Sequence, residues 1–226
     1  MSQQYEIEIK SLLGSKENAD ALIAKLQLKN NNSLVPKKSK QLNHYFTYTD
    51  LAKFHDMLIS HIPEAKKEIF SKIIKEGKNF SIRTREVNDT KVILVIKASL
   101  DDSSSSNGIS RMEFESEMSM TLGELDQLLL NAGLEYQAKW SREREEYDAG
   151  DALVCIDKNA GYGYLAEFEK VVEDKSKNDE VKEALFSLMD DLGVQELKQD
   201  RLERMFEFYN KHWAEYYGTD KTFIIE

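Results

Sequence analysis

Charged side chains alternate with other residues in five short segments of this 226-residue chain. One of these segments is acidic, two are basic, and two carry both signs. Residues two apart in a β-strand point to the same face, so the charges of each segment would share one face. The residues are Glu6, Glu8 and Lys10; Arg83 and Arg85; Arg111, Glu113, Glu115 and Glu117; Arg142 and Arg144; and Glu167 and Glu169.

Solvated outer faces of a sheet are the ordinary explanation, because charged side chains are mostly exposed. The separation of the signs argues against it, since like charges two apart on one face repel and a surface selected for stability would intersperse them. Clustered carboxylates are explained if Mg²⁺ or Mn²⁺ binds among them, because both ions prefer oxygen ligands. Clustered guanidinium groups are explained if they bind phosphates, which arginine contacts bidentately. The pattern therefore predicts a site for a polyphosphate and a metal ion.

Eight segments have the alternation and composition of β-strands, and neighbouring segments are mostly joined by short connections. They lie at residues 5–10, 42–48, 79–87, 91–98, 110–118, 138–147, 151–157 and 163–172. Helices are expected after Ser15, over 51–77 with a break near Pro63, after Thr121 with Glu124 completing a capping box, and over 177–217 with a joint near Gly193. Residues 29–40 and the serine-rich run 101–108 are expected to form loops. This order favours an α+β fold, an eight-stranded antiparallel closed β-barrel with helices packed outside.

The composition of the chain bears on its domain organisation, its partners and its location. No internal repeat or linker divides the sequence, so we expect a single domain over 1–226, with barrel strands in about 5–172 and a helical extension in about 177–217. The net charge of −10 argues against general nucleic-acid binding, and the absence of an apolar run of about 18 residues argues against a membrane span. Cys155 is the single cysteine, so no intramolecular disulfide forms, which fits a reducing, cytoplasmic location.

The ordered set of charged segments resembles the CYTH superfamily, the triphosphate tunnel metalloenzymes. Residues 6–10 (EIEIK) resemble the ExExK signature of that family, and residues 81–86 (SIRTRE) resemble its arginine strand. Residues 111–115 (RMEFE), 142–144 (RER) and 163–169 (GYLAEFE) resemble its later elements, with Lys97 and Asp157 at positions where the family has a lysine and an aspartate. The resemblance extends from about residue 5 to 172 and implies an eight-stranded antiparallel tunnel.

The resemblance also implies roles for individual residues. Mg²⁺ or Mn²⁺ would be held by Glu6, Glu8, Glu113, Glu115, Asp157, Glu167 and Glu169. The triphosphate would be bound by Lys10, Arg83, Arg85, Lys97, Arg111, Arg142 and Arg144, with Lys139 competing for the role of Arg142. Glu169 or Glu167 would orient or deprotonate a water molecule, and Lys10 would orient a carboxylate or tune the nucleophile.

Three functions are compatible with these residues. The leading hypothesis is metal-dependent hydrolysis of inorganic triphosphate or thiamine triphosphate. The second is a class IV adenylyl cyclase, which would convert ATP to cyclic AMP and pyrophosphate. The third is a polyphosphate-binding module without catalysis, which the glutamates disfavour because binding a polyanion requires cations. The expected partner is a small triphosphate, and the C-terminal aromatic residues are expected to pack in the core, with a homodimer contact as the alternative.

Overall fold

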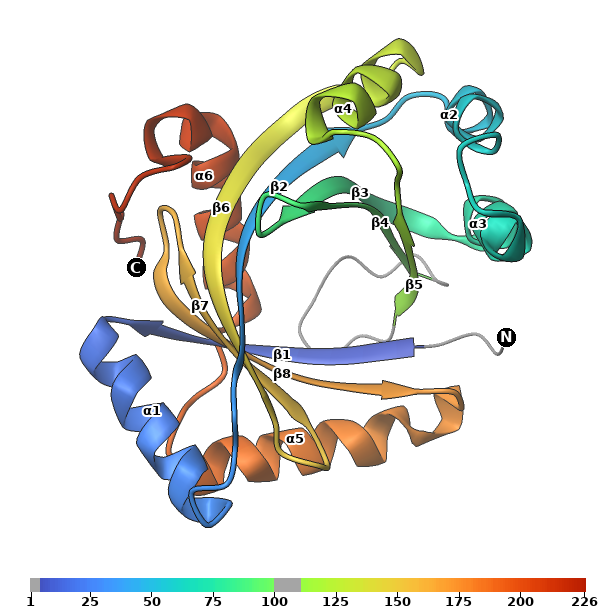
Figure 1. Cartoon of the computed structure of the whole chain (residues 1–226). Coiled ribbons are helices and arrows are strands. Elements are labelled where there is room, and N and C mark those ends of the chain that lie inside the picture. The colour runs from blue at the N-terminus through green and yellow to red at the C-terminus, as the bar shows by residue number, and fades with distance from the viewer. Residues whose placement is uncertain (1–4, 100–110) are drawn as a thin grey trace. The chain divides into compact units, whose positions relative to one another are not determined.

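Eight antiparallel strands form a closed barrel in the order β1-β5-β4-β3-β2-β6-β7-β8 (Figure 1). The computed structural model describes residues 5–99 and 111–226, and of Arg111 and Lys175 it describes the backbone alone. The strands are β1 (Tyr5–Gly14), β2 (Lys37–Thr47), β3 (Lys78–Val87), β4 (Lys91–Ser99), β5 (Arg111–Glu117), β6 (Glu135–Asp148), β7 (Leu153–Asn159) and β8 (Gly163–Val172). The predicted fold class is confirmed.

The helices begin where the sequence signals predicted. They are α1 (Lys16–Lys29), α2 (Leu51–Leu58), α3 (Glu64–Glu76), α4 (Leu122–Asn131), α5 (Asn178–Leu192) and α6 (Gln199–Tyr216), with a 3₁₀ turn at Lys175–Lys177. The Ser15 side chain accepts a hydrogen bond from the backbone N–H of Asn18 at the start of α1. Thr121 and Glu124 form the predicted capping box of α4. Gly193 ends α5 in the left-handed conformation, with φ of 68°.

Three strands are clearly longer than the sequence indicated. β1 continues to Gly14, and β6 extends over 135–148 instead of 138–147. β2 begins at Lys37, inside the stretch 29–40 that was expected to be a loop. Residues 38–41 alternate exposed lysines with Ser39 and Gln41, whose side chains are buried although they are polar. Because burial there involves polar residues, the hydrophobic pattern did not reveal the strand. The predicted loop at 101–108 lies outside the described residues.

By its contacts the chain divides into two compact units. Within the described residues, the first unit contains 5–40 and 141–226, and the second contains 41–99 and 111–140. The expectation of a single domain over the whole chain stays a prediction.

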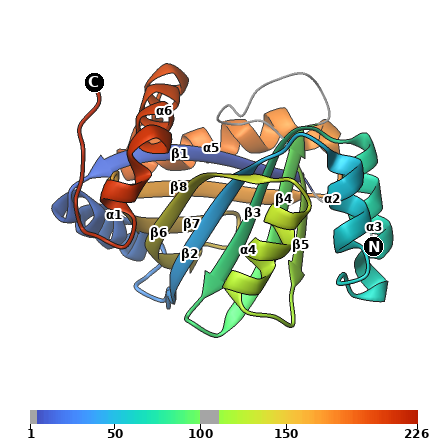
Figure 2. The same ribbon diagram turned by 90° about the horizontal axis from the view of Figure 1, so that it is seen from above.

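In the first unit, helices α1 and α5 cover the apolar face of β1, β7 and β8 (Figures 1 and 2). The buried side chains of this core include Ile7, Ile9, Val154, Ile156, Ala166 and Phe168 from the strands and Leu22, Leu26, Leu185 and Met189 from the helices. Burial of one large apolar side chain contributes about 1.5–3 kcal/mol. The core therefore holds these strands with one face against the helices, and the alternate residues point the other way.

The second unit repeats this arrangement with different helices. Helix α3 packs on β5 and helix α4 on β3, and Figure 2 shows α4 running beside the strands. The Phe70 ring of α3 lies edge-to-face with Phe54 of α2 and tilted against Phe114 of β5, with ring centroids 6.0 and 5.3 Å apart. Here too, alternate strand residues face away from the helices.

A buried polar cluster fastens α4 to the strands of the second unit. Asp126 of α4 accepts hydrogen bonds from the Thr84 hydroxyl at 2.6 Å and from the Tyr136 hydroxyl at 2.7 Å, and His44 Nδ1 lies 2.6 Å from its carboxylate. Burial alone would raise the pKa of Asp126, but the hydrogen bonds from His44, Thr84 and Tyr136 lower it. The carboxylate is therefore charged, and both of its oxygens take part in hydrogen bonds.

The residues after α6 pack back on the first unit. The backbone N–H of Gly161 donates to the carbonyl of Lys221, and that of Phe223 donates to the carbonyl of Gly161. The Phe223 ring lies against the rings of Tyr162 and Tyr209, and Tyr209 is fully buried. Gly161 has φ of +81°, and a Cβ there would meet the Tyr209 ring at 2.8 Å, so the close approach requires glycine. Core packing of the C-terminal aromatic residues is confirmed for Tyr209.

The Asp126 cluster generates a stability prediction. Replacement of Asp126 by Asn should lower the free energy of unfolding by about 2–4 kcal/mol at pH 7, because an amide cannot accept from all three neighbours of the carboxylate. The pKa of Asp126 is lowered in the folded state, so its stabilisation is present above the ordinary aspartate pKa of about 3.9 and disappears as the pH falls through the folded value. Urea unfolding at a series of pH values tests this.

The matched control for that experiment is Asp190→Asn on the exposed side of α5, which should change the unfolding free energy by less than about 0.5 kcal/mol. A deficit in Asp126→Asn that stays constant from pH 7 to below pH 4 would contradict the charged role of the carboxylate.

Candidate metal-ion and phosphate site

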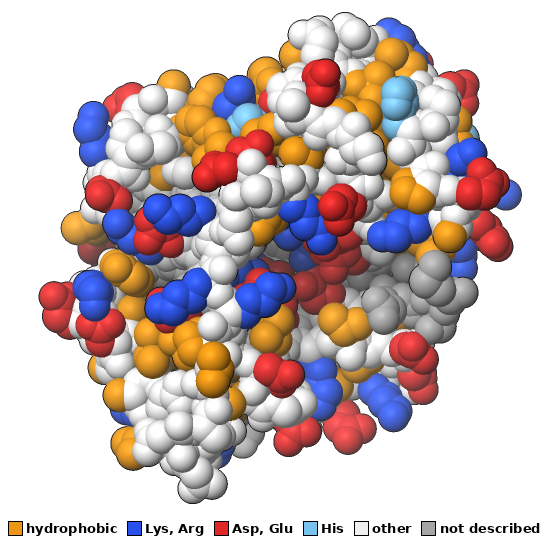
Figure 3. All heavy atoms as spheres, viewed as in Figure 1, with side chains coloured by type: hydrophobic (Ala, Val, Ile, Leu, Met, Phe, Trp, Pro, Cys, Tyr) orange, Lys and Arg blue, Asp and Glu red, His pale blue; other side chains and the backbone are white. Residues whose placement is uncertain are grey.

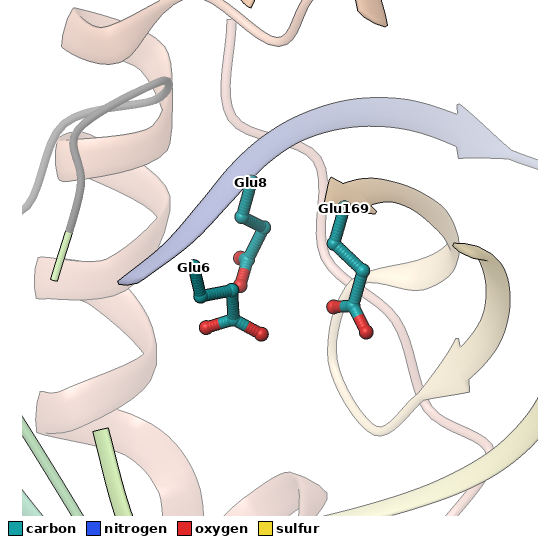
Figure 4. A group of neighbouring side chains, drawn as sticks. All are labelled: Glu6, Glu8 and Glu169. Carbon is teal, nitrogen blue, oxygen red and sulfur yellow. The ribbon is translucent and has the colours of Figure 1, made fainter. Parts of the chain in front are cut away.

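Three glutamates of β1 and β8 come together on the face of the first unit that points away from its helices. β1 and β8 are antiparallel neighbours, with Glu8 opposite Glu169 in the register. Glu6, Glu8 and Glu169 each offer a carboxylate oxygen, and these oxygens lie within 4.8 Å of one another. Figure 4 shows the two side chains of β1 and the one of β8 extending into the same space.

This group fits a small divalent cation. Mg²⁺ is bound octahedrally by oxygens at about 2.0–2.1 Å, so neighbouring ligand oxygens on one ion lie about 3 Å apart. The oxygens of Glu6, Glu8 and Glu169 lie within 4.8 Å of one another, somewhat wider than that value. Three carboxylates so close repel one another, and a bound cation would remove that repulsion. The donors are all oxygens, which suits Mg²⁺ and Mn²⁺.

An arginine pair lies on the same face of the sheet, held by one aspartate. Arg144 of β6 is opposite Asp157 of β7 in the register. Arg144 donates from Nε to Asp157 Oδ1 at 2.7 Å and from Nη2 to Oδ2 at 2.6 Å, and Arg142 Nη1 donates to the same Oδ2 at 3.0 Å. Nη2 of Arg144 also donates to Glu167 of β8. Asp157 is fully buried, so these ionic hydrogen bonds are shielded from water.

The charges of this group hold one another ionised. Burial by itself would raise the pKa of Glu167, but Arg144, Lys10 and Arg142 lower it well below its usual range. Burial would lower the pKa of Arg144, whereas Glu167 and Asp157 raise it well above its usual value. Glu167 is therefore a carboxylate with little tendency to accept a proton.

Lys10 connects the glutamate group to the arginine pair. Its ammonium contacts the Glu8 carboxylate and lies 3.5 Å from Glu167 Oε1. In the register of β1 and β8, Lys10 is opposite Glu167 just as Glu8 is opposite Glu169. The charged face of the first unit thus extends from the three glutamates through Lys10 and Glu167 to the arginine pair.

The second unit presents its own charged face. In the register of β3, β4 and β5, Arg83 and Glu115 are both opposite Val95, and Lys97 is opposite Glu113. Lys97 Nζ lies 3.4 Å from Glu113, and Arg85 Nη1 lies 3.1 Å from Glu115. These strands bring the predicted cations and carboxylates of this unit together.

Two further residues support the arginines of β3, and the sequence analysis had not assigned them a role. Arg83 Nη1 donates to the Tyr45 hydroxyl at 2.6 Å, and Arg85 Nε donates to Asn43 Oδ1 at 2.9 Å. Both partners lie on β2, directly opposite the arginines that they contact. Asn43 and Tyr45 are two residues apart, so the sequence alone indicated that their side chains would share one face of a strand.

Arg83 keeps an unused donor. In the part of the chain that the structure describes, its Nε is buried and has no hydrogen-bond partner. A buried N–H of an arginine without an acceptor is costly, and a phosphate oxygen would satisfy it.

Not every predicted residue joins these groups. The Asp157 carboxylate, predicted as a metal ligand, is hydrogen-bonded by two arginines and is outside the cluster of Glu6, Glu8 and Glu169. Lys139 Nζ lies over the Tyr136 ring, 4.1 Å from its centroid. The side chain of Arg111 lies outside the described residues.

The surface charge and the helices bear on larger partners. On the face drawn in Figure 3, Lys and Arg side chains lie among Asp and Glu side chains, without one continuous basic field over the described residues. Among the helices that the structure describes, none is both long and apolar enough to cross a membrane.

Comparison with known proteins agrees with this arrangement. The model of the CYTH domain matches residues 74–202, more than half of the chain. The structure of the PH1819 protein from Pyrococcus horikoshii OT3 is 22% identical, with a TM-score of 0.62, and the match covers 90% of this chain and 99% of that one. No curated protein matches the sequence significantly.

Two other similar structures carry a functional name. A protein named as a candidate adenylate cyclase from Vibrio parahaemolyticus is 14% identical with a TM-score of 0.59, over 90% of this chain and 98% of that one. A second candidate adenylate cyclase, from Bacillus halodurans, is 16% identical with a TM-score of 0.51, over the same shares. At these identities the likeness establishes the fold alone.

The glutamate group generates a binding prediction. Replacement of Glu169 by Gln should weaken Mn²⁺ binding at least about tenfold, because a neutral amide replaces one of three charged ligands. Isothermal titration calorimetry with Mn²⁺ alone measures this, and Glu183→Gln on exposed α5 is the control. Equal Mn²⁺ affinity in both variants would exclude Glu169 as a ligand.

Proposed function

This chain belongs to the CYTH domain family, and on that basis we propose that it hydrolyses a small triphosphate, inorganic triphosphate or thiamine triphosphate, with Mg²⁺ or Mn²⁺. One observation carries the proposal. The oxygen ligands for a divalent cation and the pair Arg142 and Arg144 share one face of one sheet, and Lys10 lies between them. A triphosphate needs both kinds of group within a few ångströms of each other.

Substrate binding would rest on the arginines. A triphosphate carries about four negative charges at neutral pH, and guanidinium groups bind phosphate oxygens in a planar, bidentate geometry. Arg144 is held at two of its nitrogens by carboxylates, so its orientation is fixed before substrate arrives. This fixed orientation favours tight, oriented binding of a polyphosphate.

The glutamates would serve the chemical step. A cation held by Glu6, Glu8 and Glu169 would neutralise charge on the phosphoryl group that is transferred. Of the two carboxylates predicted as catalytic, Glu167 is poorly suited to deprotonate a water molecule, because its pKa is lowered well below the usual range. Lys10 contacts Glu8 and lies near Glu167, which fits the predicted role of orienting carboxylates.

Cyclisation of ATP is the alternative, and the names of two similar structures favour considering it. Hydrolysis requires the triphosphate contacts and a water molecule. Cyclisation requires in addition that the protein position the ribose 3′-oxygen as the nucleophile. The charged residues of the two units fit the triphosphate contacts that hydrolysis requires. Hydrolysis is therefore the leading proposal.

An assay of product release decides between these functions. The protein is incubated with Mg²⁺ or Mn²⁺ and with inorganic triphosphate, thiamine triphosphate or ATP in parallel, and with EDTA as the metal-free control. We expect orthophosphate from one of the first two substrates, and none with EDTA. Cyclic AMP and pyrophosphate from ATP would assign the cyclase activity instead. Binding of triphosphate without any turnover would leave a binding module.

Replacement of Glu8 by Gln should abolish the metal-dependent turnover, by about 100-fold or more, with the fold retained. Circular dichroism and the thermal unfolding midpoint establish folding, and steady-state kinetics measure the loss. Substantial turnover by a well-folded Glu8→Gln protein would contradict the role of Glu8 as a metal ligand.

A further inference from the structure

We propose that Asp157 is a positioning residue that fixes the guanidinium groups of Arg144 and Arg142 for the triphosphate, and that it does not bind the metal ion. The inference rests on the proposed function and specifies how its phosphate-binding half is built. It changes the role that the family resemblance implied for this residue.

The contacts of Asp157 account for both of its oxygens. Oδ1 accepts from Arg144 Nε at 2.7 Å, and Oδ2 accepts from Arg144 Nη2 at 2.6 Å and from Arg142 Nη1 at 3.0 Å. The pair with Arg144 is a bidentate fork, the geometry in which a carboxylate and a guanidinium group fit best. Asp157 is fully buried, and Arg144 is 7% exposed, so neither group is satisfied by water.

The pairing of the two strands also holds Arg144 and Asp157 together. Arg144 and Asp157 are directly opposite in the β6–β7 register, and the same hairpin places Arg142 two residues away on the same face. Side chains directly opposite on neighbouring strands are close enough to interact without spanning a loop. The arrangement is therefore a fixed property of the hairpin.

A metal ion at Asp157 would compete with two arginines, whose hydrogen bonds already use three of about four acceptor sites of the carboxylate. Displacement would leave a buried guanidinium group without its carboxylate, which strongly destabilises a protein. The glutamates Glu6, Glu8 and Glu169 form a separate group that already offers three oxygen ligands. The carboxylates of the first unit thus divide by role, with the three glutamates suited to the cation and Asp157 to the arginines.

Fixing the guanidinium groups in advance reduces the conformational entropy that is lost when the triphosphate binds. A guanidinium group that is already oriented loses little conformational freedom when a phosphate binds to its remaining N–H groups. Without Asp157 the arginines would still be charged, but they would have to be ordered by the substrate. Loss of the anchor should therefore weaken triphosphate binding and leave metal binding nearly unchanged.

The test is Asp157→Asn, which keeps the side-chain volume and removes the charge. We expect the KM for triphosphate and its calorimetric Kd to rise by about tenfold or more, and the Kd for Mn²⁺ alone to change by less than about twofold. Asp151→Asn, on an exposed residue of the same hairpin, is the matched control and should change neither. A large rise in the Mn²⁺ Kd, with triphosphate binding retained, would overturn the proposal.

A double-mutant cycle with Arg144→Gln tests whether Asp157 acts through the arginine. If it does, adding Asp157→Asn to Arg144→Gln should raise the triphosphate Kd little further, so the two effects are far from additive. Fully additive effects would contradict the proposal. If Asp157→Asn alone does not fold, the double variant, which removes both charges of the pair, is compared with Arg144→Gln for Mn²⁺ affinity. A loss of Mn²⁺ binding there would identify Asp157 as a ligand.

The two hypotheses fail in different ways. Absence of turnover by the unmutated protein on any triphosphate would overturn the proposed function, whereas calorimetric binding by the variants judges Asp157 without requiring turnover. If the unmutated protein also binds no triphosphate, both are overturned.

Discussion

The alternation of apolar and charged side chains along each strand is the constraint on which the rest of this structure depends. In β1, Ile7 and Ile9 are fully buried, while the glutamates beside them point the opposite way. Apolar faces must be covered, and α1 and α5 do this in the first unit as α3 and α4 do in the second. The helices therefore occupy the side that an ordinary barrel would leave to solvent, and the charged side chains are concentrated on the other face.

A sheet face with this much charge is tolerable only as a network. An unpaired buried charge costs several kcal/mol, a large part of the 5–15 kcal/mol that stabilises a typical domain. The chain from Asp157 through Arg144 and Glu167 to Lys10 pairs each charge with opposite neighbours. The same pairing orients the groups, so the requirement for stability and the requirement for recognising a polyanion are met by one set of contacts.

The sequence predicted the barrel, the helix starts and most residues of the charged faces, because two-residue alternation and capping are local signals. It missed the first part of β2, where Ser39 and Gln41 are buried in place of apolar residues. It also missed Asn43 and Tyr45, whose contacts depend on the β2–β3 register. The partner of Asp157 could not be predicted from the sequence. An aspartate can bind a metal ion or an arginine, and only the distances in the structure distinguish the two.

The packing of the last residues bears on where the domain ends. The CYTH match stops at residue 202, within α6, yet the backbone of Gly161 is hydrogen-bonded to Lys221 and Phe223. Gly161 lies in the turn between β7 and β8, the strands that carry Asp157 and Glu167. The folding unit is thus longer than the recognisable family segment. A truncation designed from sequence similarity alone would remove Tyr209, Lys221 and Phe223 and release the turn that joins two strands of the site.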